Sequence, residues 1–164
     1  MKFVFKLLLF TILSSFLIFG GEGKALSMEK RSTKKWTGYV ANGLTCGIHG
    51  RDMTGFTIGF PLEDDANSYR VHIKGRGWLP PVIYSDTSDF DNGYAGTKAG
   101  DPIDGIAIYG TKRYRVHTKG GRWLPWVTGY NINDSRNGYA GNLGSTIDLI
   151  QVEGSRVYAC AYNI

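Results

Sequence analysis

Alternating apolar and polar residues predict β-strands through most of the chain after residue 31. Residues 69–73 and 114–118 read Tyr-Arg-Val-His-Ile and Tyr-Arg-Val-His-Thr, and their alternation and their β-branched or aromatic types are typical of half-buried strands. Residues 103–108 and 147–152 place isoleucines on a shared face in the same way. No stretch after residue 31 has a convincing 3.6-residue period, and the 23 glycines oppose long helices. We therefore predict an all-β domain.

Two kinds of short motif separate these strands. Trp-Leu-Pro-x-Val, at residues 78–82 and 123–127, predicts a second short strand in which the proline implies an edge position or a bend. Asn-Gly-Tyr-Ala-Gly, at residues 92–96 and 137–141, predicts a turn, since Asn-Gly is well suited to positive φ angles.

The strands and turns belong to a repeat. Residues 69–82 return 45 residues later as residues 114–127, with ten of fourteen positions identical. A fixed period of this length indicates a repeat architecture in which each unit completes the core of its neighbours. A duplicated unit favours several equivalent binding sites over one asymmetric catalytic centre.

A third copy of the unit is divided between the two ends of the chain. With an offset of 50 residues, Asn42-Gly43 matches the first Asn-Gly turn, and residues 53–58 match residues 103–108. Residues 155–158, Ser-Arg-Val-Tyr, resemble the opening strand of a unit. We therefore expect one composite unit from both termini and three units in all: residues 36–60 plus 155–164, residues 69–110 and residues 114–154.

These units predict a single all-β domain over residues 32–164, in which three pseudo-equivalent units close into a ring. A β-trefoil and a β-prism both fit three units of three or four short strands around a threefold pseudo-axis. Unit length favours the trefoil, and the prism remains the alternative. A domain of this size can bury a sufficient core without needing disulfide bonds or metal ions for stability.

Residues 1–25 read as a secretory signal peptide. Lys2 and Lys6 form its basic start, residues 7–19 its apolar stretch, and small residues follow. The apolar stretch is short for a membrane span, which needs roughly 20 residues, so a retained anchor is the less favoured alternative. Lys30-Arg31 resembles a kexin-type cleavage site, which would make residues 26–31 a propeptide; chance occurrence in a basic leader is the other interpretation. We expect a secreted, extracellular protein.

Most of the positive charge belongs to the leader. Five of the 19 basic and two of the 14 acidic residues precede Ser32, so the remainder carries 14 basic and 12 acidic residues, a net charge of +2. Nucleic-acid binding requires a clustered basic face, and nothing after Lys35 supplies one. We expect no nucleic-acid partner.

The two cysteines, Cys46 and Cys160, lie in opposite halves of the composite unit. In an oxidising compartment we expect them to pair, closing a loop of about 115 residues worth roughly 4–5 kcal/mol in the chain-entropy model. A free reactive thiol is the alternative.

The sequence contains no His-Glu-x-x-His motif, no Gly-x-Ser-x-Gly motif and no glycine-rich phosphate-binding loop between a strand and a helix. His72 and His117 occupy equivalent positions in different units, so the ring should hold them apart, and we expect no metal site and no cofactor. We expect each histidine to fill a strand position and donate a local hydrogen bond. Asp104 and Asp148 are also one per unit, and we expect them to pair with arginine or to bond the Asn-Gly turn. The chain is therefore expected to be non-enzymatic, with a small cell-wall hydrolase as the remote alternative.

Aromatic and amide side chains are the candidate binding chemistry, because a flat ring beside hydrogen-bonding groups suits a sugar. The candidate ligand-binding residues are Trp126, Tyr130, Trp123, Trp78, Tyr94, Tyr139, Asn92 and Asn137. For Trp78 and Trp123 a place in the core is the favoured interpretation, since large aromatic residues dominate small cores. Trp126 replaces Pro81 of the other unit, so the repeat does not require it and a ligand contact is favoured. Asn133 begins a glycosylation sequon in a predicted loop.

The motifs Tyr-Arg-Val-His, Trp-Leu-Pro-Trp-Val, Asn-Gly-Tyr-Ala-Gly and Ile-Asp-x-Ile-Gln resemble tandem tryptophan-containing repeats at the C-terminal ends of secreted bacterial cell-wall hydrolases, notably clostridial-type lysozymes and amidases. The resemblance is close over residues 114–152, good over residues 69–108 and thin before residue 60. In such enzymes the repeats are accessory, wall-associated modules beside a separate catalytic domain, and we expect no such domain here. The resemblance implies a surface- or glycan-binding module acting alone, and it carries over no ligand residues.

Together these observations predict a secreted, non-enzymatic, lectin-like module that binds peptidoglycan or a related polysaccharide of the cell wall. The expected partner is an extracellular polysaccharide or a cell surface, with no membrane span. A secreted toxin or effector that acts on another organism is the alternative function.

Overall fold

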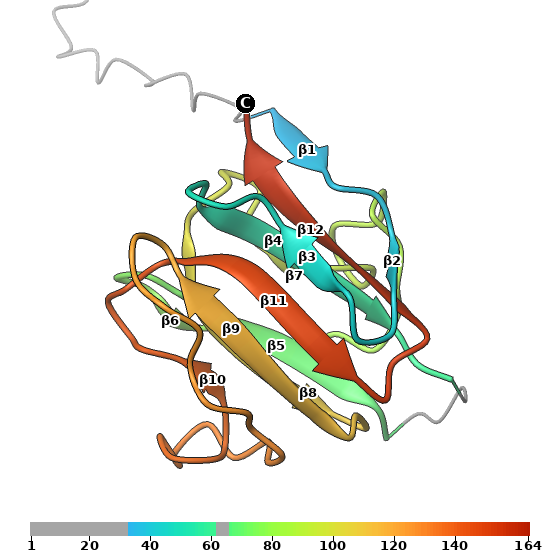
Figure 1. Ribbon diagram of the computed structural model, residues 1–164. Coiled ribbons are helices and arrows are strands. Elements are labelled where there is room, and N and C mark those ends of the chain that lie inside the picture. The colour runs from blue at the N-terminus through green and yellow to red at the C-terminus, as the bar shows by residue number, and fades with distance from the viewer. Residues whose placement is uncertain (1–32, 62–65) are drawn as a thin grey trace, which may run out of the picture.

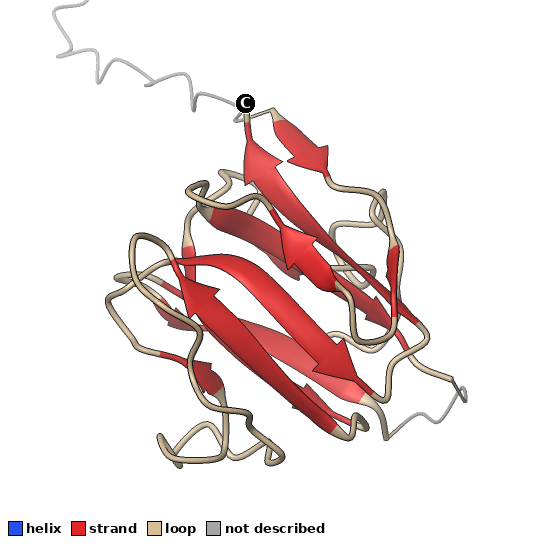
Figure 2. Ribbon diagram, in the orientation of Figure 1, coloured by secondary structure: helices blue, strands red, loops and turns tan. Residues whose placement is uncertain are grey.

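The computed structural model describes residues 33–61 and 66–164, which form strands, turns and loops without a helix (Figure 2). The predicted signal peptide and propeptide lie outside the described residues. No helix that could span a membrane occurs in the described part. The strands are β1 (Lys34–Trp36), β2 (Val40–Ala41), β3 (Thr45–Gly47), β4 (Met53–Gly59), β5 (Ser68–Ile73), β6 (Gly77–Trp78), β7 (Ala95–Gly96), β8 (Ile103–Tyr109), β9 (Arg113–Thr118), β10 (Ala140–Gly141), β11 (Ile147–Glu153) and β12 (Val157–Asn163).

Three antiparallel sheets correspond to the three units (Figure 1). Each is built on one long strand pair: β5 with β8, β9 with β11, and β12 with β4. The first two pairs confirm the strands predicted from the Tyr-Arg-Val-His and Ile-Asp-x-Ile patterns. None of the sheets closes into a barrel.

The third pair joins the two ends of the described chain. β12 lies between β4 and the N-terminal strands β1 and β2, and the Ile164 amide donates to the Thr33 carbonyl at 3.3 Å. The composite unit is therefore present. Its register differs from the expected one by three residues: Tyr158 pairs with Ile58 as Tyr69 pairs with Ile108, so Tyr158 rather than Ser155 opens the repeat. Burial explains this, because Tyr158 is the side chain that reaches the core.

The segment from Trp36 to Val40 is a third copy of the tryptophan motif, which the sequence analysis did not identify. Trp36 pairs with Ala161 in the way that Trp78 pairs with His72. Val40 pairs with Tyr158 in the way that Val82 bridges Tyr69. Only the opening strand of the composite unit is therefore supplied from the C-terminus.

Each unit also lends a short strand to a neighbouring sheet. β7, from the first unit, pairs with β4 of the composite unit. β10, from the second unit, pairs with β8 of the first, and β3, from the composite unit, pairs with β11 of the second. The exchange is cyclic, so each sheet depends on its neighbour for an edge.

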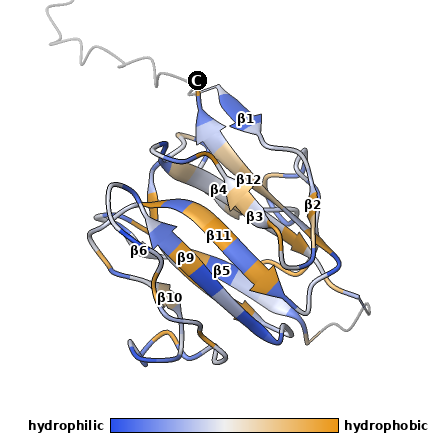
Figure 3. Cartoon of the chain, viewed as in Figure 1, coloured by the Kyte–Doolittle hydropathy of each residue, from blue (hydrophilic) through white to orange (hydrophobic). Residues whose placement is uncertain are grey.

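One continuous hydrophobic cluster joins the inner faces of the three sheets. Figure 3 shows hydrophobic and hydrophilic bands along β9 and β11, as expected when one face of a sheet is buried. Tyr69, Tyr114 and Tyr158 are fully buried, and each phenol donates a hydrogen bond to a loop carbonyl, that of Tyr84, Gly129 or Leu44. The repeated tyrosine thus ties each opening strand to its own loop.

The glycines of the two Asn-Gly turns serve a purpose other than the predicted one. Neither Gly93 nor Gly138 has a positive φ angle. A Cβ atom at Gly93 would lie 2.2 Å from the carbonyl oxygen of Asp86, and one at Gly138 would lie 1.8 Å from that of Asn131. Close backbone packing therefore requires glycine in these turns.

Candidate functional site

A histidine and an aspartate form a hydrogen-bonded pair on the sheet of the first unit. The Nδ1 atom of His72 lies 2.5 Å from Oδ1 of the buried Asp104. The other carboxylate oxygen accepts the Gly144 amide of the second unit at 2.7 Å. The ring of Trp78 meets the His72 ring edge-on, with centroids 5.3 Å apart. The aspartate therefore joins two units, instead of pairing with arginine or the Asn-Gly turn as predicted.

The second unit repeats this arrangement. Nδ1 of His117 lies 2.7 Å from Oδ1 of Asp148, and Oδ2 accepts the Gly50 amide of the composite unit at 2.7 Å. Trp123 again meets the histidine edge-on, at 5.5 Å. The local hydrogen bond predicted for these histidines is confirmed in both units. One additional histidine, His49, approaches the second pair, with its ring centroid 5.3 Å from that of His117.

Trp78 and Trp123 are half-buried and lie outside the hydrophobic core, so the favoured core interpretation was wrong. Their positions in the sheets place them over the polar histidines instead. The two repeat tyrosines lie beneath tryptophans: Tyr139 packs edge-on against Trp78, and Tyr94 packs against Trp36, both at 5.2 Å between centroids. Both tyrosines are buried, with 8% of their surface exposed, which leaves little area for a ligand.

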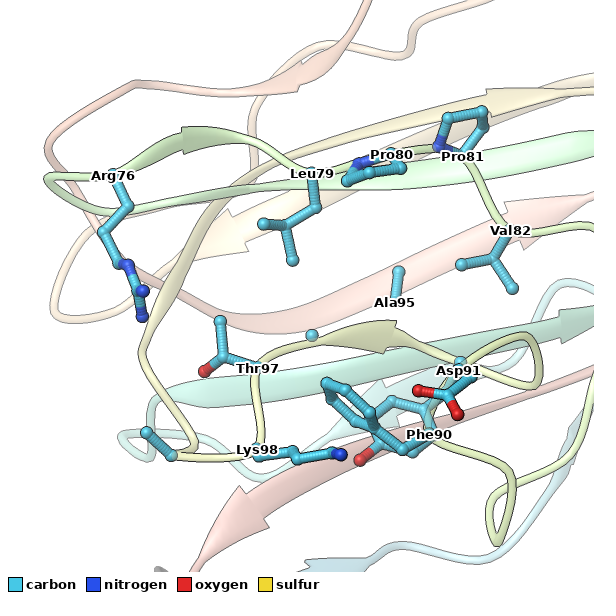
Figure 4. A pocket seen from close by; sticks show the side chains of 13 residues that line it. Arg76, Leu79, Pro80, Pro81, Val82, Phe90, Asp91, Ala95, Thr97 and Lys98 are labelled. Carbon is cyan, nitrogen blue, oxygen red and sulfur yellow. The ribbon is translucent and has the colours of Figure 1, made fainter. Parts of the chain in front are cut away.

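A cleft of about 420 Å³ opens beside the first unit. One wall is the tryptophan motif and the other is the segment through β7, and side chains from both walls point into the gap (Figure 4). The lining residues are Arg76, Leu79, Pro80, Pro81, Val82, Phe90, Asp91, Tyr94, Ala95, Gly96, Thr97, Lys98 and Ala99. The cleft therefore combines apolar walls and an aromatic ring with charged and hydroxyl groups.

Charged side chains of both signs lie beside the Phe90 ring and along the cleft wall. The amine of Lys98 lies 4.5 Å from the centre of the Phe90 ring (Figure 4). Asp101 forms an ion pair with Arg76 at 2.5 Å and accepts the Thr97 hydroxyl at 2.9 Å, which holds both residues at the cleft wall. Such fixed polar groups beside an aromatic surface can orient a polyhydroxylated ligand.

A second lysine, Lys34, contacts two of the residues that line the cleft, Thr97 and Tyr94. The Lys34 amine donates to the Thr97 carbonyl and lies 4.7 Å from the centre of the Tyr94 ring. Burial lowers the pKa of Lys34 to about 8, against an opposing effect of Asp101. Burial, assisted by Asp91, raises the pKa of Tyr94.

The Lys34 amine predicts a rise of stability with pH. Its pKa is lower in the folded than in the unfolded chain, so the unfolded chain binds more protons between about pH 8 and 10.5 and the free energy of unfolding increases across that window. Solvent screening limits the increase to on the order of 1–2 kcal/mol. Urea titrations from pH 7 to 10 would measure it, and Lys34→Met should abolish the rise. An unchanged slope in that variant would contradict the assignment.

Trp126 and Tyr130 lie on the surface beside arginine side chains, separate from the cleft. The guanidinium groups of Arg113 and Arg115 lie 4.4 and 4.6 Å from the centre of the Trp126 ring. Arg70 lies 5.5 Å from the Tyr130 ring and donates to its hydroxyl at 3.2 Å. Both predicted contacts are half-buried, and neighbouring cations already occupy part of their ring surfaces.

The predicted amide groups lie in the exposed loops. The Oδ1 atom of Asn137 accepts the Thr128 amide at 2.8 Å, so this side chain supports its loop. Asn92 is exposed beside the cleft residue Asp91. Asn133, the sequon residue, is also exposed.

Cys46 and Cys160 are free thiols in the structure, contrary to the predicted bond, and both are buried with 1% of their surface exposed. They lie close together, because the composite unit places β3 against β12. A hydrogen bond with Cys160 lowers the pKa of Cys46, and burial raises the pKa of Cys160.

Sequence reasoning missed Phe90, Lys98 and Arg76 as cleft residues. The signal was available, because Phe90 aligns with Ser135 and is therefore not required by the repeat. The same reasoning that selected Trp126 would have selected Phe90. Comparison of the units could not show that the tryptophan motif forms the opposite wall of the cleft, since that depends on how the two segments pack together.

Comparisons with protein-family models, with curated proteins and with solved structures each find no match to this chain.

Proposed function

We propose that the protein is a non-enzymatic, lectin-like module that binds a polysaccharide, with peptidoglycan or a related wall glycan as the ligand class. The cleft of the first unit is the observation that carries this proposal. Its volume of about 420 Å³ lies in the range of small-ligand sites, which is roughly 300–1,000 Å³. One or two sugar rings are of suitable size for such a space.

The chemistry of the cleft suits a sugar better than a purely apolar ligand. The Phe90 ring offers a flat surface against which the apolar face of a pyranose can stack. Asp91 accepts hydrogen bonds from hydroxyl groups, while Lys98 and Arg76 donate them to hydroxyl or carboxylate oxygens. Peptidoglycan supplies hydroxyl, amide and carboxylate groups in one polymer, which matches this set of charges.

The arrangement of the units also favours a binding role. We propose that the three sheets form a prism-like body around their common core, with one outward surface per unit. The outer surfaces share tryptophans Trp36, Trp78 and Trp123, and weak contacts repeated on one body raise avidity for a repeating polymer. The cleft of the first unit would then be the principal site.

The proposed location of the protein is extracellular, after removal of residues 1–25. An oxidising compartment would also allow Cys46 and Cys160 to form the disulfide expected from the sequence, since the two thiols are already neighbours. The proposed bond would join β3 to β12 and hence two of the three sheets.

Co-sedimentation with insoluble peptidoglycan, chitin and cellulose tests the function. Phe90→Ala should weaken binding to the preferred polymer about tenfold or more, because it removes the stacking ring. Tyr84→Ala is the matched control: Tyr84 is exposed, follows the tryptophan motif by two residues and does not line the cleft. Trp126→Ala should weaken binding less, since Trp126 does not line the cleft.

Two results would contradict the proposal. Equal binding to bare plastic or lipid would show that retention is non-specific. No binding to any of the three polymers would favour the secreted toxin or effector function, for which dependence of activity on cleavage after Arg31 is the next measurement.

A further inference from the structure

We propose that His49 and His117 form a surface site for a divalent transition-metal ion of the zinc class, with Asp148 orienting the second imidazole. One nitrogen of each ring and one carboxylate oxygen of Asp148 lie within 4.8 Å of one another. None of these residues lines the cleft, so the inference is independent of the proposed glycan function.

The carboxylate prepares one ligand for a metal. Asp148 is fully buried, and its Oδ1 lies 2.7 Å from Nδ1 of His117. That hydrogen bond directs the ring and leaves Nε2 for a metal, as in the carboxylate–histidine–metal arrangement common in metalloproteins. His117 itself is 7% exposed, so the metal would lie at the rim of the sheet.

The same carboxylate also anchors the second ligand. Its Oδ2 accepts the amide of Gly50 at 2.7 Å, and Gly50 directly follows His49. The backbone that carries His49 is therefore fixed beside the His117 ring, while the His49 side chain is exposed.

Metal binding requires His49 to approach Nε2 of His117. Ligand atoms around a tetrahedral zinc ion, with bonds of about 2.0–2.1 Å to nitrogen, are roughly 3.3 Å apart. Because the His49 side chain is exposed, its rotation can bring a ring nitrogen to about this distance from Nε2 of His117. Water would occupy the remaining positions, which predicts an exchangeable ion rather than a closed structural site.

The first unit offers an internal comparison in which one ligand is missing. His72 and Asp104 repeat the pair, and the Gly144 amide contacts Asp104 at the same 2.7 Å. The residue before Gly144 is Leu143, which is exposed where the composite unit has His49. The anchored loop thus serves the fold in both places, and His49 adds a metal ligand in only one.

Isothermal titration of the full, untagged chain with zinc chloride tests the site. Wild type should bind one ion through His49 and His117. His49→Leu, which copies the loop of the first unit, should lose this binding without loss of the fold. Leu143→His should add a second ion beside His72 and raise the stoichiometry to two, whereas the variant with both changes should bind one. Asp148→Asn should weaken binding about 10- to 100-fold.

Three outcomes would overturn the inference. The first is no heat of binding by wild type up to about 1 mM zinc. The second is binding that persists unchanged in His49→Leu, which would place the ion elsewhere, for example on the two cysteines. The third is a folded Leu143→His variant that still binds only one ion, because the same geometry would then have failed to create a site.

Discussion

A chain that ends before β12 is expected not to fold. β12 (Val157–Asn163) is an interior strand that pairs with β1, β2 and β4, and it contributes the buried residues Tyr158 and Cys160 to the common core. Removing it would expose the inner face of one sheet and the edges of three strands. The stabilising free energy lost with these contacts should exceed the total stability of a typical domain, which is about 5–15 kcal/mol. Circular dichroism and a urea titration would show no cooperative transition.

A circular permutant provides the control for this truncation. Residues 33–164 would be joined through a short linker between Ile164 and Thr33, which already share a hydrogen bond, and opened between β8 and β9. This chain keeps β12 and makes the composite unit continuous, so it should unfold cooperatively. A truncated chain with a normal unfolding transition, or a permutant without one, would contradict the role of the terminal strands.

Oxidation of Cys46 and Cys160 is expected to raise the free energy of unfolding by about 4–5 kcal/mol. The bond would close a loop of about 115 residues and so reduce the entropy of the unfolded chain. The lowered pKa of Cys46 makes it the thiol that forms the thiolate first. Titration with urea after treatment with oxidised glutathione, compared with dithiothreitol, measures the difference.

The repeat supplies a matched variant for this experiment. Registers place Cys46 where the other units have Ala95 and Ala140, and Cys160 where the first has Val71. Cys46→Ala combined with Cys160→Val therefore copies native packing, and it should fold while losing all dependence on oxidation. Equal stability of oxidised and reduced wild type, with the thiols shown to be consumed, would contradict the expected bond.

The strand content and the composite unit could be predicted from the sequence because both depend on local pattern and repetition. The alternation in Tyr-Arg-Val-His and the isoleucine face of Ile-Asp-x-Ile both specify which side of a strand is buried. The register of β12 was mistaken because Ser-Arg-Val-Tyr at residues 155–158 matches by residue type, whereas the core selects the tyrosine.

The candidate sites were less accessible to sequence reasoning. Aromatic residues were chosen by analogy between units, which found Tyr94 but missed Phe90 and Lys98 in the same cleft. The histidines were expected to lie apart because they belong to separate units. In the structure, however, the loop of one unit lies on the sheet of the next. His49 and His117 are 68 positions apart in the chain yet have neighbouring rings.

The sequence by itself determined the repeated strands and the division of the third unit between the two ends. These follow from local alternation and from burial, which each unit specifies for itself. Only the tertiary structure decided the contacts between units: β3, β7 and β10 crossing to neighbouring sheets, the carboxylates that accept amides of adjacent loops, and the walls of the cleft. Such contacts join surfaces that no single period describes, because their geometry depends on how the three sheets pack around one core.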